Sequence, residues 1–287
     1  SRGNWEEKVI LNRSATPFGS VDEDHMTQLN DVLLQAREAR VRPSRDDKAL
    51  ADWNGLMIAA LARAGATFGQ RSWIAAAARA FAAVRETMTW RDDIGRERLG
   101  HAWCAGRLQT TAMLDDYANM ANAALALFEV TGDPLYLGYA RDWVETAHAL
   151  YWDEDGGGYF FTAVDAETLI VRTKTANDSA TPSGNGAIAF ALARLFYITG
   201  EADDRTRAGA TVAALSVEAL RAFPHSTALL SAFALLEDSI QVLIAGHPDA
   251  AETAAMLLAA HTAAGSEEHT SELQSLAYLV CRLLLEK

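Results

Sequence analysis

The sequence predicts an all-α protein built as a ring of helix pairs, an α/α toroid, with a small β-hairpin inserted. Three observations lead to this fold class. Helical periodicity of apolar residues covers most of the 287 residues. Glycines that close apolar helices recur along the chain, and the helices before and after each glycine differ in polarity. Repeated antiparallel helix pairs packed around one centre account for all three.

The periodic segments define the expected helices, and each has polar or glycine signals at its ends. They lie near residues 21 to 41, 48 to 66, 71 to 89, 110 to 131, 134 to 151, 183 to 199, 203 to 223, 226 to 237 and 248 to 264. Two segments break the pattern. Residues 158 to 174 alternate in polarity around a turn and predict a β-hairpin, and residues 240 to 246 predict a lone strand.

The glycine repeat suggests how the helices are connected. Gly69, Gly132 and Gly200 each follow an apolar helix, at spacings of 63 and 68 residues. A glycine at this place supplies the left-handed conformation that ends a helix. Eight residues after each glycine comes an alanine of the next helix, namely Ala77, Ala140 and Ala208. The spacing suits one helix pair plus a connecting loop in each repeat.

The two helices of a pair differ in polarity. Segments 49 to 64 and 186 to 198 are apolar nearly all round, as buried helices must be. Segments 71 to 89 and 134 to 149 carry charged residues on one face. Inner and outer helices therefore alternate. Successive antiparallel pairs make all inner helices run in one direction, so that their N-termini share one rim.

Composition excludes several classes of partner. The chain has 25 basic and 38 acidic residues, a net charge of −13, and no basic run, so neither nucleic acid nor an anionic membrane is expected. No apolar run approaches the roughly 18 to 20 residues that span a bilayer. Cys104 and Cys281 make no disulfide framework, which favours a reducing, cytoplasmic setting. Neither a metal site nor a bound cofactor is expected.

The C-terminal residues 266 to 287 differ from the rest of the chain. The alanine-rich helical pattern ends at Gly265, and the sequence from Ser266 to Ser275 resembles a translated sequencing-library adapter. We therefore expect residues 1 to 265 to form the toroid domain and 266 to 287 to be a foreign tail. An ordinary amphipathic C-terminal helix is the alternative.

Polar side chains gather where the inner helices begin, and these are the candidate site residues. The candidates for ligand binding are Lys48, Trp53, Asn54, Tyr117, Arg172, Lys174, Ser183, Asn185 and His225. The candidate catalytic carboxylates are Asp47, Asp115, Asp116 and Asp178. In a toroid these clusters should converge at one cavity mouth. Each one taken singly is also a common helix cap, which is the alternative explanation.

Two groups among these candidates are harder to explain by capping. Asp115, Asn119 and Asn122 form one stripe of an otherwise apolar helix, and the two asparagines lie too deep for a cap. A ligand site and a structural network explain this stripe equally well. Arg172 and Lys174 share one face of the expected hairpin, ahead of the loop 177 to 185, and cations there can pair with rim carboxylates. A solvated hairpin face is the alternative.

Six motifs together resemble one family. They are Arg42-Pro43, DDKALADWNGLMIAALARAG (46 to 65), LDDYA (114 to 118), DEDGGGYFFT (153 to 162), VRTK (171 to 174) and DSATPSGN (178 to 185). These strings, in this order, resemble the helical part of the thioredoxin-domain-containing proteins of the YyaL and spermatogenesis-associated type. The resemblance runs from about Asn4 to Gly246. It implies part of an (α/α)6 toroid similar to six-hairpin glycosidases and N-acylglucosamine 2-epimerase, with a thioredoxin-like domain upstream.

Two functions are compatible with this resemblance. The first is processing of a sugar or similar polyol by a hydrolase or epimerase, in which two of the four carboxylates divide the acid and base roles. Trp53 and Tyr117 would then supply stacking platforms for sugar rings. The second is a non-catalytic binding or scaffold module that serves the thioredoxin-like domain. Carboxylates that face open space would favour the first, and carboxylates used up in caps and ion pairs would favour the second.

Overall fold

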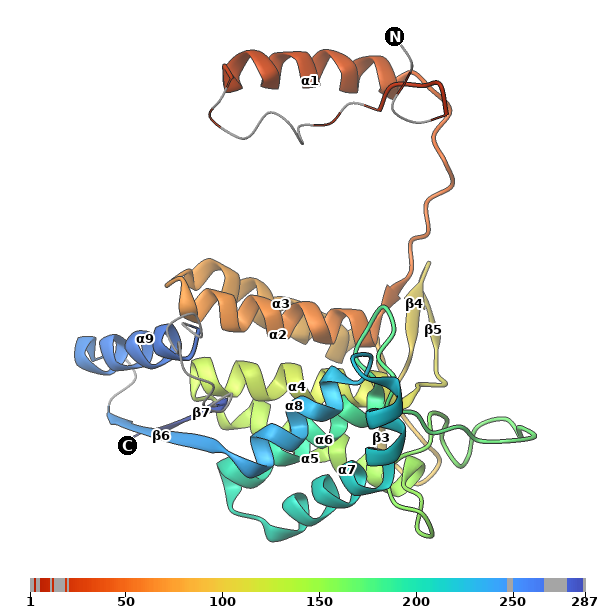
Figure 1. The fold of residues 1–287 in the computed structure, drawn as a ribbon, viewed down its shortest axis with the longest axis vertical. Coiled ribbons are helices and arrows are strands. Elements are labelled where there is room, and N and C mark those ends of the chain that lie inside the picture. Colours follow the sequence, from red (N-terminus) through yellow and green to blue (C-terminus); the bar gives the residue numbers. More distant parts are fainter. Residues whose placement is uncertain are drawn as a thin grey trace. The chain divides into compact units, whose positions relative to one another are not determined.

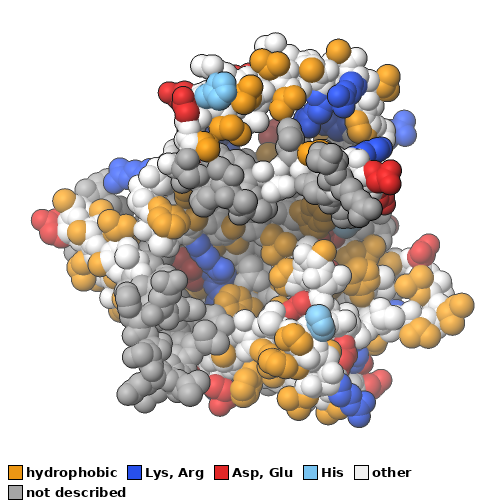
Figure 2. Space-filling model, turned by 45° about the horizontal axis from the view of Figure 1, so that its top comes forward, with side chains coloured by type: hydrophobic (Ala, Val, Ile, Leu, Met, Phe, Trp, Pro, Cys, Tyr) orange, Lys and Arg blue, Asp and Glu red, His pale blue; other side chains and the backbone are white. Residues whose placement is uncertain are grey.

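The computed structural model of the chain describes residues 3, 6–10, 12, 19, 21–246, 250–265 and 278–285. Two compact units make up the chain, Ser1–Asp46 and Asp47–Lys287, and each is considered by itself. Nine helices and seven strands lie along the described parts of the sequence, and helices dominate (Figure 1). Charged and hydrophobic side chains are interspersed on the face of the molecule shown in Figure 2. No helix among the described residues is long and apolar enough to cross a membrane.

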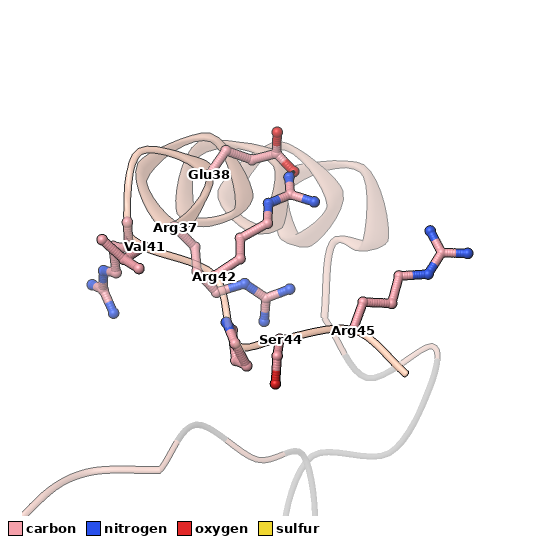
Figure 3. Close-up of a pocket in the computed structure, with 8 residues that line it drawn as sticks. Arg37, Glu38, Val41, Arg42, Ser44 and Arg45 are labelled. Atoms are coloured by element: carbon pink, nitrogen blue, oxygen red, sulfur yellow. Dashed lines mark hydrogen bonds and ion pairs between the residues drawn. The ribbon is translucent and has the colours of Figure 1, made fainter. Parts of the chain in front are cut away.

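The first unit contains helix α1, Glu23–Glu38, which begins at the side-chain cap Asp22 and buries none of its residues. At the C-terminal end of the helix, a hollow of about 630 Å³ is lined by residues 37, 38 and 40 to 45, four of which are arginines. Arg42 pairs with Glu38, whereas Arg45 points away from both (Figure 3).

The second unit consists mainly of helix pairs. The pairs are α2 (Ala51–Thr67) with α3 (Arg71–Thr87), α4 (Leu114–Thr131) with α5 (Pro134–Tyr151), and α6 (Gly184–Thr199) with α7 (Ala202–Ala222). Helices α8 (Thr227–Glu237) and α9 (Ala251–Gly265) follow. These helices, with α1, confirm the nine segments expected from periodicity.

The alternation of inner and outer helices is also confirmed. Helices α2, α4, α6 and α8 pack against one another in that order, and α3, α5 and α7 pack against the helix before them (Figure 1). Gly132 and Gly200 end α4 and α6 in the left-handed conformation, and Gly69 has a positive φ just after α2. The alanines eight residues later, Ala77, Ala140 and Ala208, are fully buried.

The inner helices run in one direction, because contacts join their N-terminal ends. The Asp52 amide near the start of α2 donates to Asp116 in the first turn of α4. Asp115 of α4 lies against Gly184, the first residue of α6. One carboxylate, that of Asp178, accepts hydrogen bonds from the amides of Ser183 before α6 and Ala228 in α8. The shared rim predicted from the repeat is therefore present.

The predicted β-hairpin at residues 158 to 174 is wrong, because these residues form only isolated bridges. One backbone hydrogen bond joins the two arms, from Phe161 N to Thr173 O. Other backbone groups of this segment bind the backbone of Leu114, Leu150 and Tyr151, or side chains. Asn185 pairs with both the amide and the carbonyl of Tyr159, and Arg172 donates to the carbonyl of Thr162. These side chains take the place of a facing strand.

Two small antiparallel sheets lie instead between α3 and α4. Strands β2 (Thr89–Arg91) and β3 (Glu97–Leu99) form one hairpin. Strands β4 (Ala102–Cys104) and β5 (Arg107–Gln109) form another, which β1 (Ala49–Leu50) joins. Because β1 leads directly into α2, this three-stranded sheet fixes the first inner helix at the rim.

The strand expected at residues 240 to 246 is confirmed as β6, Ser239–Gly246, although it is not alone. It pairs in parallel with β7, Tyr278–Leu285, which belongs to the segment expected to be a foreign tail. The adapter-like string itself, residues 266 to 275, lies outside the described residues.

Candidate functional site

Asp116 is the centre of a hydrogen-bonded group at the rim. Its side chain is fully buried, and its carboxylate accepts hydrogen bonds from the amides of Asp52, at 3.1 Å, and Met113, at 2.8 Å. His101, between strands β3 and β4, places its Nδ1 3.0 Å from Oδ2 of Asp116. The carboxylate of Asp116 therefore joins the starts of α2 and α4 to the segment between strands β3 and β4.

Asp115, the neighbouring carboxylate, has a different environment. It is partly exposed and lies against the first turn of α6, where the Gly184 amide is its hydrogen-bonding partner. Burial, together with the negative charges of Asp116 and Asp52, raises the pKa of Asp115 to about 6. This carboxyl group is thus suited to hold or release a proton near neutral pH.

Two further titratable groups complete the rim cluster. Burial and the charge of Asp116 raise the pKa of Asp52. The hydrogen bond to Asp116 raises the pKa of His101. Three carboxyl groups and one imidazole therefore share a small volume, in which the charge of Asp116 raises the pKa of each of the other three.

A cavity of about 370 Å³ lies between the four inner helices. Asn119 and Asn122 line it, so the polar stripe of α4 faces the interior of the ring. Asn122 is satisfied, because it donates to Ala118 O and Ala187 O and accepts from Arg194. Asn119 is only 2% exposed, and its Nδ2 has no hydrogen-bond partner in the described part of the chain. Asp115 lies one helical turn nearer the rim on the same stripe.

The other candidates on the first two inner helices have different fates. Trp53 is 59% exposed, whereas Asn54 donates to Leu50 O within its own helix start. Asp47 and Lys48 are exposed just before β1. Tyr117 is wrong as a stacking platform, because its ring is fully buried and its hydroxyl accepts from the Leu99 amide.

The two cations ahead of the loop 177 to 185 do not meet the rim carboxylates. Arg172 donates to the carbonyls of Thr162 and Leu150, and its guanidinium lies 4.2 Å from the ring centre of Phe160. Lys174 pairs with Asp153. The expectation that they converge with Asp115 or Asp116 is therefore wrong, and both cations hold the irregular segment that replaces the predicted hairpin.

The candidates near α6 and α8 mostly cap helices or hold loops in place through hydrogen bonds. Ser183 caps α6 by accepting from the Gly186 amide. Asp178 accepts from Ser183 N, Ala228 N and the Thr227 hydroxyl, so its oxygens are already used. The Asn185 side chain is buried among backbone partners, and the His225 side chain is exposed.

Two members of the rim cluster were missed from the sequence, Asp52 and His101. Asp52 follows the expected helix start and carries no signal apart from its place in the motif of residues 46 to 65. His101 carries no sequence signal either, because no potential ligand partner lies near it in the sequence. The hairpin β4–β5 places His101 next to Asp116, and strands of three residues are too short to show a periodic pattern in the sequence.

Comparisons with known proteins support the resemblance drawn from the motifs. Mouse spermatogenesis-associated protein 20 is 32% identical over 270 residues, which are 89% of this chain. The human protein of the same name is 31% identical over 270 residues. The chain spans only 34% of the length of either relative. No protein-family model matches the chain.

Solved structures identify the fold as an α/α toroid. The GH76 α-mannanase BT2949 of Bacteroides thetaiotaomicron has a TM-score of 0.54 at 13% identity, covering 78% of this chain and 59% of that protein. An inactive variant of the α-1,6-mannanase GH76A of Salegentibacter, in complex with α-1,6-mannotetrose, has a TM-score of 0.53 at 14% identity. This match covers 89% of this chain and 76% of that one.

Proposed function

We propose that this chain is the toroid part of a carbohydrate-processing protein of the YyaL and spermatogenesis-associated type. The carrying observation is the placement of Asp115, whose pKa is about 6, on the polar stripe that continues into the cavity between the inner helices. A sugar in this cavity would meet amide groups along the stripe, and one that extends toward the rim would meet the titratable carboxyl group of Asp115 one helical turn away.

In the proposed reaction Asp115 is the catalytic residue that gives or takes the proton. As the acid of a hydrolase it would protonate the leaving oxygen, and as the base of an epimerase it would remove a proton from a sugar carbon. Asp116 and His101 act as positioning residues, because Asp116 is fully buried and His101 is bonded to it. Exposed Trp53 is the proposed stacking platform.

The structural neighbours add support. The mannanase GH76A that binds mannotetrose was made inactive by replacing two adjacent aspartates with alanine. This chain has an adjacent pair on its second inner helix, Asp115 and Asp116. A sugar hydrolase or epimerase with this pair at its centre is therefore the function we favour.

A non-catalytic module is the second candidate. Its support is the use of Asp116 and Asp178 as hydrogen-bond acceptors for backbone amides, which leaves them little capacity for a ligand. In this version the toroid binds a protein or metabolite on behalf of a thioredoxin-like domain. That domain would lie in the remaining length of the intact protein.

The pair of variants Asp115→Asn and Asp116→Asn distinguishes the two functions. We expect Asp115→Asn to abolish turnover and weaken binding of mannose and cellobiose oligosaccharides, with the fold intact by circular dichroism. Asp116→Asn should lower the melting temperature. The Asp116 carboxylate accepts three hydrogen bonds, and asparagine replaces one of its two acceptor oxygens with an NH2 group that can only donate. Sugar binding that is unaffected by Asp115→Asn would remove the catalytic function and leave the binding module.

A further inference from the structure

The cavity between the inner helices is lined by a cation, the guanidinium of Arg63. Arg63 projects from α2 and lines the cavity together with Asn119, Asn122, Phe190 and Ser231. Within the part of the chain that the structure describes, its guanidinium has neither a hydrogen bond nor an ion pair. Its side chain is exposed to solvent.

The charges around Arg63 do not neutralise it. Glu129 is paired with Arg194, whose Nη2 lies 2.9 Å from Oε2 of the glutamate. Both partners of this pair are buried. Two guanidiniums and one carboxylate therefore leave one net positive charge inside the ring. Burial and the nearby Arg194 lower the pKa of Arg63 to about 10, so the side chain is still a cation at neutral pH.

Asn119 supplies a second, independent donor at the same cavity. Its buried Nδ2 has no partner among the residues that the structure describes, and an unsatisfied buried amide destabilises the folded state. A ligand oxygen in the cavity would satisfy this group. The cavity thus offers a guanidinium fork toward one end and an amide donor from the second inner helix.

We propose that this cavity is a binding site for an anionic carbohydrate, whose carboxylate or phosphate group pairs with Arg63 and whose hydroxyl oxygens meet Asn119. The proposal rests on the sugar-processing function and adds the class of substrate. A guanidinium binds either anion through two parallel hydrogen bonds. A neutral sugar would leave the charge of Arg63 uncompensated.

The dimensions of the cavity limit the size of the ligand. Gly55 and Arg63 both line it from the same helix, and eight residues of α-helix span about 12 Å. A volume of about 370 Å³ is at the small end of ligand pockets. One or two sugar rings are therefore the appropriate length for a ligand that reaches from the rim to Arg63.

The test is calorimetric titration of the full 287-residue chain with glucuronate, glucose 6-phosphate and glucose. We expect at least one of the two anionic sugars to bind tenfold or more tightly than glucose, and the comparison between them shows which anion the site accepts. Arg63→Met should abolish this preference and Arg63→Lys should keep part of it. The control Arg79→Met removes the same charge from the exposed surface of outer helix α3 and should change nothing.

Three outcomes would overturn the inference, and the first leaves the proposed function standing. Equal affinities for glucose and both anionic sugars, with binding still lost in Asp115→Asn, would mean a neutral sugar site. Tight anion binding that survives Arg63→Met would place the anion elsewhere. No binding of any of these sugars would overturn both proposals. Conversely, anion binding that depends on Arg63 and is unaffected by Asp115→Asn supports the anion site and removes the catalytic role of Asp115.

Discussion

Gly184 and Asp115 are in direct contact across the interface of two inner helices. A Cβ atom at position 184 would overlap Oδ1 of Asp115 and would lie 2.9 Å from Cδ2 of Leu114. The absence of a side chain at Gly184 lets its amide approach the carboxylate of Asp115. The position that opens α6 thus controls the environment of the proposed catalytic group.

Gly184→Ala should destabilise the protein by about 2 kcal/mol, because the added methyl group forces the two helices apart. Gly209→Ala is the matched control. Gly209 also lies in a helix, and a Cβ there meets nothing within 4 Å. Alanine at this control position should be neutral or stabilising by up to about 1 kcal/mol. Urea unfolding of the two variants measures both effects, and equal stabilities would contradict the contact.

Asp115→Asn should stabilise the fold at neutral pH. The pKa of Asp115 rises from 3.8 to about 6 on folding, so the unfolded state loses its proton first. Stability therefore falls as pH rises from about 4 to 6, and the cost by neutral pH is about 2–3 kcal/mol. The asparagine variant lacks this titration. Melting temperatures at pH 4 and pH 8 should differ less for Asp115→Asn than for the wild type.

His101→Gln should have an effect at low pH only. The hydrogen bond to Asp116 raises the pKa of His101 above 6.5, so its stabilising contribution is present below pH 6.5 and is lost as pH rises through the folded pKa. We expect the variant to be less stable by about 1 kcal/mol at pH 5 and unchanged at pH 9. Histidine NMR titration of the wild type checks the pKa itself. A value at or below 6.5 would argue against the contact.

Glu129→Gln should destabilise the chain by about 3 kcal/mol, because it leaves the buried guanidinium of Arg194 without a counter-charge beside the second cation, Arg63. The double variant Arg63→Met with Glu129→Gln should recover part of this loss. A double-mutant cycle from thermal or urea unfolding measures the coupling. If the changes in unfolding free energy of the two single variants simply add, Arg63 does not interact with the Arg194–Glu129 pair.

Deletion of residues 266 to 287 tests the prediction of a foreign tail. If the tail is foreign, the melting temperature should stay the same or rise after truncation at Gly265. The pairing of β6 with β7 provides the opposite expectation, because truncation would then expose a strand edge. A clear fall in melting temperature, or aggregation of the shortened chain, would identify the tail as native.

The helical part of the fold was predictable because its signals are local. Apolar periodicity located each helix, and Gly132 and Gly200 ended α4 and α6 where a left-handed residue was expected. The hairpin prediction failed at Tyr159, whose alternating neighbours indicated a strand. Its backbone groups bind the Asn185 side chain, which comes from a helix 26 residues away in sequence. No local pattern contains that information.

Site residues were predictable to a smaller extent, because most polar residues near helix starts are caps. Asp115 and the polar stripe of α4 stood out, since Asn119 and Asn122 lie too deep to cap the helix. Asp178 also lies near the start of an inner helix, but its carboxylate accepts hydrogen bonds from the amides of Ser183 and Ala228 and so links α6 to α8. The position of His101 depends on a hairpin of three-residue strands, which sequence patterns do not reveal.

The serial packing of the inner helices also determines how the chain can fold. Each inner helix contacts mainly its own outer partner and the next inner helix along the sequence. Such a contact map favours growth from a local nucleus, in which each helix pair forms and then docks on the previous one. Folding can therefore proceed during synthesis, and loss of structure should begin at the exposed end helices and advance inward.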